Sequence, residues 1–184
     1  MPPVMTRLDQ DHVRLTRLLD LFENLLDRFH DGDEPDYDLM CEMLGYMDDY
    51  SDQVHHPTED LIFQRVLEKG TERRDVFDVL MRQHQVIPQL SKRFQQSLDG
   101  ILREEVLLRE EVEVQGRELI ATLRGHLRLE NEEAFPVARA VLDDGDWAAL
   151  EDAAPTMDDP LFSIPDPQRY RSLYARLFEQ SQTP

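Results

Sequence analysis

Four stretches of the sequence repeat apolar side chains at alternating steps of three and four residues, and each stretch places one histidine on its apolar stripe. This spacing is typical of an amphipathic helix that buries one face. The four histidines are His12, His55, His84 and His126. Long helices joined by short connections favour antiparallel neighbours. The pattern therefore predicts an all-α, up-down-up-down four-helix bundle with a histidine from every helix pointing at its middle.

Glycine and proline residues separate these stretches. Gly32 and Pro35 interrupt the chain after the first stretch, Gly70 after the second and Gly100 after the third. Glycine suits the left-handed cap of a helix, and proline rarely continues one. The predicted helices therefore carry their apolar stripes over 8–29, 40–66, 77–98 and 108–141.

The pattern changes after Gly145. A short WAALED turn is followed by a proline-rich run and by a last amphipathic piece over 170–178. The prolines of the run are Pro155, Pro160, Pro165 and Pro167. We interpret residues 1–145 as the bundle and residues 146–184 as an extension packed on it, made of a strap and short extra helices.

Composition excludes several classes of partner. The 184 residues include 39 acidic and 20 basic side chains, and the formal charge is -19. Such a field repels phosphate backbones and anionic lipids, so we expect neither a nucleic-acid nor a membrane partner. No uncharged apolar stretch approaches the roughly 18 residues that span a bilayer. The single cysteine, Cys41, and the lack of signal-peptide features at the N-terminus predict a cytoplasmic protein.

Two of the four histidines have a glutamate four residues later, in the pairs His55/Glu59 and His126/Glu130. This spacing places both side chains on one helix face, about one turn apart. Buried carboxylates cost several kcal/mol each unless cations compensate them, and no regular lysine or arginine accompanies them on the stripes. Imidazole with carboxylate suits iron or manganese better than magnesium or calcium, and the lack of cysteine disfavours structural zinc and iron–sulfur sites.

The motifs together resemble the hemerythrin-like, or HHE cation-binding, family. The resemblance lies in Asp11-His12, in HHPTEDLIF at 55–63, in His84 and in HLRLENEEAFP at 126–136, and it spans roughly residues 8–142. It implies a non-haem centre of two iron ions, which an oxo or hydroxo group can bridge, inside a left-handed four-helix bundle. The resemblance makes Glu59 and Glu130 the bridging carboxylates. The terminal ligands it implies are His12, His55, His84 and His126.

One departure from the family bears on function. Oxygen-carrying members have a further histidine four residues after the ligand on the third helix, whereas Pro88 occupies that place here. With one nitrogen ligand fewer, coordination positions stay open, and we expect redox reactivity or sensing of oxygen, peroxide or nitric oxide rather than reversible oxygen carriage. The alternatives are iron storage, buffering or iron sensing without turnover, and a structural bundle without metal. A monomer and a homodimer are both compatible with the sequence.

Several residues near the motifs leave alternatives open. A shifted register would make His56 and Asp60 the ligands, but we prefer His55 and Glu59 because the face of His56 carries aspartates and is expected to face solvent. Pro57 should bend the second helix or divide it into two.

Three further residues could influence the site without being its main ligands. Pro88 should kink the third helix beside His84. We interpret Glu133 as a residue at the rim of the site rather than an extra ligand. Tyr50 could form a hydrogen bond to the site or ligate a metal there, although a buried tyrosine usually serves packing.

Overall fold

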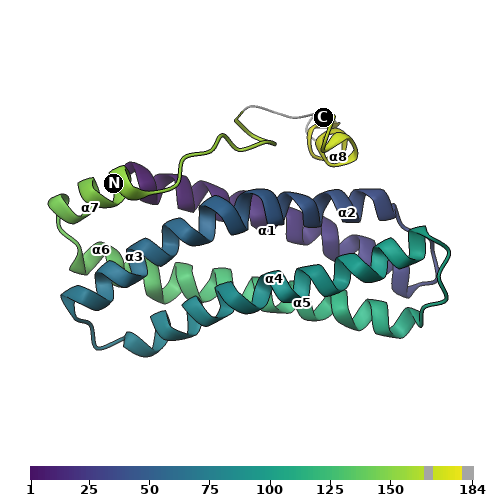
Figure 1. Ribbon diagram of the computed structural model, residues 1–184, viewed down its shortest axis with the longest axis horizontal. Helices are drawn as coiled ribbons and strands as arrows, with labels where there is room; N and C mark the ends of the chain where they lie inside the picture. The colour runs from purple at the N-terminus through teal and green to yellow at the C-terminus, as the bar shows by residue number, and fades with distance from the viewer. Residues whose placement is uncertain (164–167, 180–184) are drawn as a thin grey trace.

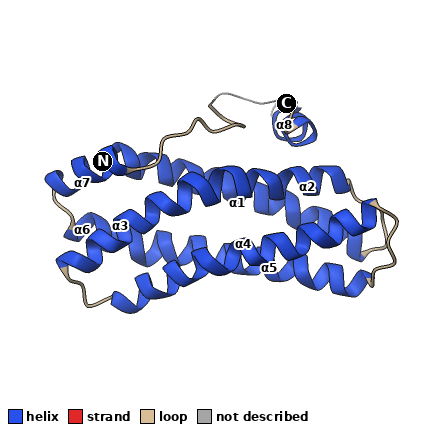
Figure 2. Cartoon of the chain, viewed as in Figure 1, coloured by secondary structure: helices blue, strands red, loops and turns tan. Residues whose placement is uncertain are grey.

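The computed structural model describes residues 1–163 and 168–179, and every regular element in these ranges is a helix (Figures 1 and 2). Four long helical segments lie side by side along the longest axis of the molecule (Figure 1). The all-α prediction is therefore confirmed.

Each segment corresponds to one predicted helix. The first is α1 (Pro3–His30), and the third is α4 (Arg74–Leu102). The second is a continuous run of α2 (Tyr37–Tyr46), η1 (Met47–His55) and α3 (His56–Lys69). The fourth is a run of α5 (Arg109–Leu129), η2 (Glu130–Ala134) and α6 (Phe135–Val141).

The predicted breaks lie close to the observed ones. Gly32 follows α1 with φ +94°, and Gly70 ends α3 with φ +90°, a left-handed conformation that glycine adopts without strain. Asp36 begins the second segment, because its side chain accepts a hydrogen bond from the backbone N–H of Leu39. The third break comes slightly later than expected, because α4 continues past Gly100 to Leu102.

The second and fourth segments each contain a π-helical stretch, η1 and η2, that ends shortly before a proline. The N–H of His56 donates to the carbonyl of Ser51, and that of Phe135 to the carbonyl of Glu130, so the wider turns lie just before Pro57 and Pro136. Proline lacks an N–H and clashes with the carbonyl four residues earlier, and a wider turn relieves this conflict. The distortion that Pro57 predicts is present, but the second segment is not divided in two.

The third segment contains a proline without a π-helical turn. Pro88 lies inside α4, which continues through it as one α-helix over Arg74–Leu102. The kink beside His84 stays a prediction.

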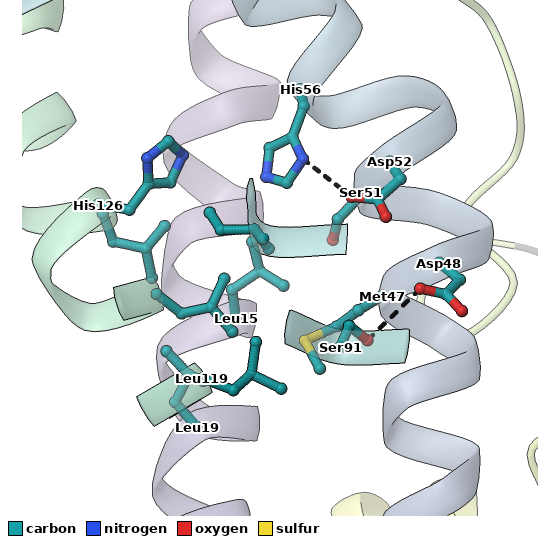
Figure 3. Close-up of a pocket in the computed structure, with 13 residues that line it drawn as sticks. Leu15, Leu19, Met47, Asp48, Ser51, Asp52, His56, Ser91, Leu119 and His126 are labelled. Carbon is teal, nitrogen blue, oxygen red and sulfur yellow. Dashed lines mark hydrogen bonds and ion pairs between the residues drawn. The ribbon is translucent and has the colours of Figure 1, made fainter. Parts of the chain in front are cut away.

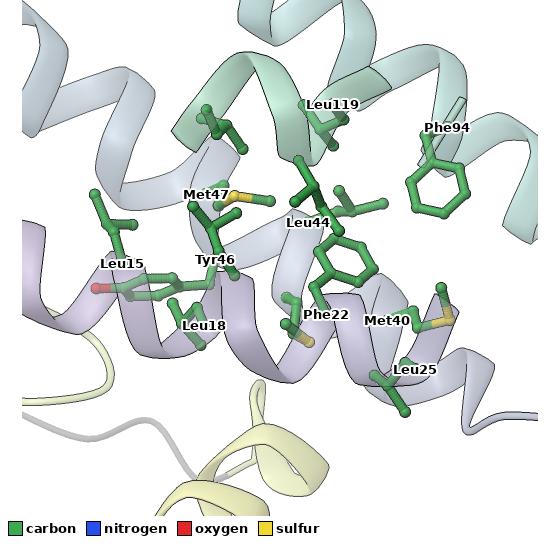
Figure 4. Packing of buried hydrophobic residues seen from close by; sticks show 14 of the residues in the cluster. Leu15, Leu18, Phe22, Leu25, Met40, Leu44, Tyr46, Met47, Phe94 and Leu119 are labelled. Atoms are coloured by element: carbon green, nitrogen blue, oxygen red, sulfur yellow. The ribbon is translucent and has the colours of Figure 1, made fainter. Parts of the chain in front are cut away.

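The apolar core has two parts. One cluster includes Phe22, Leu44 and Phe94, and Figure 4 shows how these side chains interdigitate. The other includes Phe63 and Phe77. In the first three segments the predicted histidine position separates residues of one cluster from residues of the other, and in the fourth the change comes just after His126, between Leu127 and Ala134. The bundle thus holds a polar layer between two apolar clusters.

The extension contacts the bundle at several points. Its first helix, α7 (Asp144–Ala153), buries Trp147 against the second cluster and pairs Asp146 with Arg65 at 2.7 Å. Its last helix is α8 (Arg171–Glu179), where the N–H of Leu173 donates to Glu42 at 2.8 Å. Pro165 and Pro167 of the predicted proline-rich run lie outside the described residues.

A search of the described residues for a helix both long and apolar enough to cross a membrane found none.

Candidate metal centre

Histidine and glutamate side chains from all four segments converge in the polar layer. One group consists of His12, His55 and Glu59, and its three potential ligand atoms lie within 4.8 Å of one another. A second group meets the same criterion and also contains Glu59. Its members are His56, Glu59, His84 and His126.

The glutamates connect the two groups. Glu59 Oε1 lies 3.2 Å from His12 Nε2, and Glu59 Oε2 lies 3.4 Å from His84 Nε2. Glu130 Oε2 lies 3.4 Å from His12 Nε2, and Glu130 Oε1 lies 3.1 Å from His126 Nε2. Each carboxylate therefore faces imidazoles of both groups, and both are fully buried. The structure brings together all six residues that the sequence analysis selected.

The expectation that the face of His56 is exposed to solvent is wrong. His56 is only 6 % exposed, and its ring stacks on that of His84 with 4.5 Å between ring centroids. The π-helical turn η1 ends between His55 and His56 and changes the helical phase there, so both neighbours reach the polar layer. Asp60, the other member of the shifted register, accepts a hydrogen bond from His84 Nδ1 at 2.7 Å.

The five histidines have the same arrangement around their rings. In each, Nδ1 contacts a side-chain oxygen that can accept its proton. These oxygens belong to Asn131 for His12, Asp11 for His55, Asp52 for His56, Asp60 for His84 and Gln83 for His126. Such contacts fix the tautomer with the proton on Nδ1 and leave the lone pair on Nε2, as is usual for histidines that bind metals.

Buried polar atoms without partners mark the centre of the layer. His55 Nε2, Glu59 Oε2 and both carboxylate oxygens of Glu130 lack a hydrogen bond. In addition, His84 Nε2 and His126 Nε2 lie 3.2 Å apart, although both are acceptors in the tautomer described above. Buried acceptors are rarely left unsatisfied, because each costs about 1–3 kcal/mol. A metal cation would accept the lone pairs of these nitrogen and oxygen atoms, so the side chains fit a metal site.

The charges perturb the pKa values in the absence of metal. Burial acts to lower the pKa of His12, but Glu59 and Glu130 outweigh it and raise it to about 9. His84 follows the same pattern, and Asp60, Glu130 and Glu59 raise its pKa to about 11. Burial acts to raise the pKa of Glu59, yet the facing imidazoles hold it well below the usual range. Protons on the imidazoles thus neutralise the carboxylates when no metal does.

The sequence analysis named Asp11, Asp60 and Tyr50 but did not predict the side-chain oxygens that contact Nδ1 of the histidines. Asp11 is 2 % exposed, and the hydroxyl of Tyr50 donates to it at 3.2 Å. Tyr50 therefore forms a hydrogen bond to the carboxylate that also contacts His55. Asp52 stands four residues before His56, and this spacing is a signal in the sequence that could have indicated the contact. Glu133 forms an ion pair with Arg73 at the protein surface, which agrees with the interpretation as a rim residue.

A small apolar cavity adjoins the second group. His56 and His126 lie at one end of it, and the leucines and Met47 line its side (Figure 3). About 20 Å³ is open to the centre of a water-sized molecule, which is enough for one or two small atoms. The hydroxyl of Ser51, 4 % exposed and without a hydrogen-bond partner, also borders the cavity.

Comparison with known proteins also indicates a cation-binding domain. The sequence model described as the hemerythrin HHE cation-binding domain matches residues 4–138. Searches among curated proteins and among solved structures gave no match. The match covers most of the chain and includes every histidine and glutamate of the polar layer. This chain therefore belongs to the hemerythrin HHE cation-binding domain family.

Proposed function

We propose that the polar layer is a non-haem di-iron centre that reacts with, or senses, oxygen, peroxide or nitric oxide. His12 and His55 would hold one ion, and His56, His84 and His126 the other. Glu59 and Glu130 would serve both, because each faces imidazoles of the two groups. One observation carries the proposal: His55 Nε2, Glu59 Oε2 and both oxygens of Glu130 face the same buried space without a hydrogen-bond partner, and His84 Nε2 lies 3.2 Å from His126 Nε2.

The donor atoms favour iron. Imidazole nitrogen combined with carboxylate oxygen suits iron or manganese, whereas magnesium and calcium prefer oxygen alone. Neither group of candidate ligands contains a thiolate, which makes structural zinc and iron–sulfur clusters less suitable. When bound, iron supplies one-electron chemistry toward small oxidants. The protein supplies oriented imidazoles, charge-balancing carboxylates and a site shielded from water.

The size of the adjoining cavity supports a small ligand. A space of about 20 Å³ admits a molecule of the size of water or a diatomic gas and excludes an organic substrate. The structure adds one candidate nitrogen ligand to those expected from the sequence. His56 supplies a nitrogen in place of the histidine that Pro88 replaces, so one ion would have three imidazole ligands. Open coordination positions are therefore expected at the other ion, beside His12 and His55.

Iron storage or buffering has less support. Both glutamates are fully buried, and His12 and His55 are 3 % and 1 % exposed, so exchange of the metal requires opening of the bundle. We therefore expect slow loss of iron to an external chelator.

Elemental analysis of the purified protein tests the metal centre. We expect iron near two equivalents in the wild type and clearly less in His55→Ala and in His126→Ala. His30→Ala is the matched control, because His30 is exposed and lies outside both groups. Metal-free wild-type protein, or equal iron in all variants, would contradict the proposal.

Reactivity needs a separate experiment. Ferrous protein prepared without oxygen is exposed in turn to oxygen, peroxide and nitric oxide, and its optical absorption is followed. We expect a change with at least one of them. An iron-loaded protein that responds to none would leave the metal centre in place and reject the redox or sensing role.

We extend the proposal to topology and location. Packing of α1 against α5 and of α4 against α5, with short connections, supports an up-down-up-down arrangement of the four segments. The family match over 4–138 supports a bundle domain over 1–145 and a separate extension over 146–184. The single, half-buried Cys41 supports a reducing cytoplasm.

A further inference from the structure

We propose that Asp159, which belongs to the extension, is a positioning residue that tunes the metal centre through Arg14, Asp11 and His55. The inference rests on the proposed di-iron function, because it concerns the same centre. It goes beyond that function because Asp159 lies outside the matched residues 4–138 and contacts no candidate ligand directly.

The link nearest to the centre joins His55 and Asp11. Asp11 Oδ2 lies 3.3 Å from His55 Nδ1, and the hydroxyl of Tyr50 donates to the same oxygen at 3.2 Å. A carboxylate behind a metal-binding imidazole orients its ring and raises its basicity. How much negative charge Asp11 retains therefore affects how strongly His55 donates to a bound ion.

The second link is an arginine shared by two carboxylates. Nη1 of Arg14 donates to Asp11 Oδ1 at 3.3 Å and to Asp159 Oδ2 at 3.1 Å. Asp11 and Asp159 are each only 2 % exposed, so their charges are poorly screened by water. Because one guanidinium serves both, the charge of Asp159 limits how far Arg14 neutralises Asp11.

The third link holds Asp159 in place. Its Oδ1 accepts hydrogen bonds from the N–H groups of Leu161 and Phe162 at 2.8 and 3.1 Å. Its Oδ2 also accepts from the hydroxyl of Tyr46 at 3.2 Å, and the ring of Phe162 lies under the guanidinium of Arg14 at 4.6 Å. The extension thus holds the guanidinium of Arg14 between the carboxylate of Asp159 and the ring of Phe162.

The direction of the effect follows from charge. Removal of the Asp159 charge leaves Arg14 free to neutralise Asp11 more fully, so His55 becomes a weaker donor. A weaker donor stabilises the oxidised ion less, and the reduction potential of the centre should rise. Removal of the Arg14 charge has the opposite effect, because Asp11 then retains its full charge, and the potential should fall.

Two variants with opposite expected signs test the inference. Asp159→Asn keeps an oxygen that can accept from Leu161 and Phe162 but removes the charge, and Arg14→Gln removes the cation. Asp158→Asn is the matched control, because it removes the same charge from the neighbouring, exposed residue. The reduction potential of the iron-loaded protein is measured for each. The ¹⁵N shift of His55 Nδ1 is measured by NMR in metal-free protein.

We expect Asp159→Asn to raise the potential, Arg14→Gln to lower it and Asp158→Asn to leave it unchanged, with the His55 shift moving in opposite directions in the first two variants. Equal potentials and His55 shifts in wild type and Asp159→Asn would overturn the inference. Shifts of the same sign in Asp159→Asn and Arg14→Gln would also overturn it, since they indicate general loosening. If the protein holds no iron, the proposed function fails, and the NMR measurement still decides this inference.

Discussion

The two sides of the polar layer differ in donors and in surroundings. On one side, His12 and His55 provide two imidazoles, and hydrogen-bonded polar groups such as Asp11 and Tyr50 lie behind His55. On the other side, three imidazoles meet, and an apolar cavity extends away from His56 and His126 (Figure 3). Hydrogen bonds to Nδ1 back the histidines on both sides, so the sides differ in the number of imidazoles and in the cavity, which adjoins the side with more of them.

This difference separates two requirements of a reactive centre. Open coordination positions are expected where donors are fewer, whereas room for a small molecule exists where donors are more numerous. The shared glutamates contact histidines of both sides, so a substitution on one side is expected to alter metal binding on the other. The following experiments are ordered from the largest expected effect to the smallest.

Glu59→Gln should have the largest effect, because it removes a charge that both sides share. We expect both ions to be lost, since a neutral amide no longer compensates two cations. Metal content by elemental analysis is the measurement, and Glu133→Gln is the control because Glu133 faces Arg73 at the rim. Retention of one full equivalent in Glu59→Gln would show that the carboxylate serves a single side.

His56→Gln tests whether the side with His84 and His126 has a third donor. We expect one of the two ions to become chelator-labile, with a loss of affinity on the order of 10–100-fold or more. His12→Gln should release the other ion first. The measurement is the time course of iron transfer to a chelator. Equal rates of iron transfer in His56→Gln and wild type would show that His56 is not a ligand and that the site consists of the six residues selected from sequence.

The metal-free protein should lose stability as pH rises. His12 and His84 have pKa values raised from 6.5 to about 9 and about 11, so their protonation stabilises the folded state fully below about pH 6.5. That contribution is lost as pH rises through these values. The melting temperature of metal-free protein should therefore fall above neutral pH, and the stabilisation by bound iron should grow. A flat profile, with or without iron, argues against mutual neutralisation in the layer.

Replacements at Ser51 should have the smallest effect and test the cavity alone. Ser51→Val places an extra methyl group in the cavity, and Ser51→Ala removes only the unpartnered hydroxyl. We expect Ser51→Val to slow association of nitric oxide with ferrous protein several-fold in stopped-flow measurements, and Ser51→Ala to leave it near the wild-type rate. Iron content should stay the same in both. Equal rates in all three proteins would indicate entry from the side of His12 and His55.

Much of the fold could be predicted from periodicity. The steps of three and four residues predicted four helices, and Gly32 and Gly70 lie where two of the segments end. The pairs His55/Glu59 and His126/Glu130 were found because residues four apart share a face of a regular helix. These relations are local, because the geometry of the helix sets them whatever the helix packs against.

His56 was misplaced because the regular helix fails at that point. The turn before Pro57 widens, and the face assigned on a uniform period then no longer applies. The proline is visible in the sequence, but which of the possible distortions it produces depends on how the second segment packs against its neighbours.

The sequence by itself determined the helical segments, the buried histidines and glutamates, and the need for cations to balance them, because these follow from local spacing and from the cost of burying charge. Only the tertiary structure decided that His56 joins the layer, that a cavity borders one side, and that Asp159 reaches His55 through Arg14 and Asp11. Those contacts join residues up to 145 positions apart, and no local period relates such residues. Packing alone brings them together.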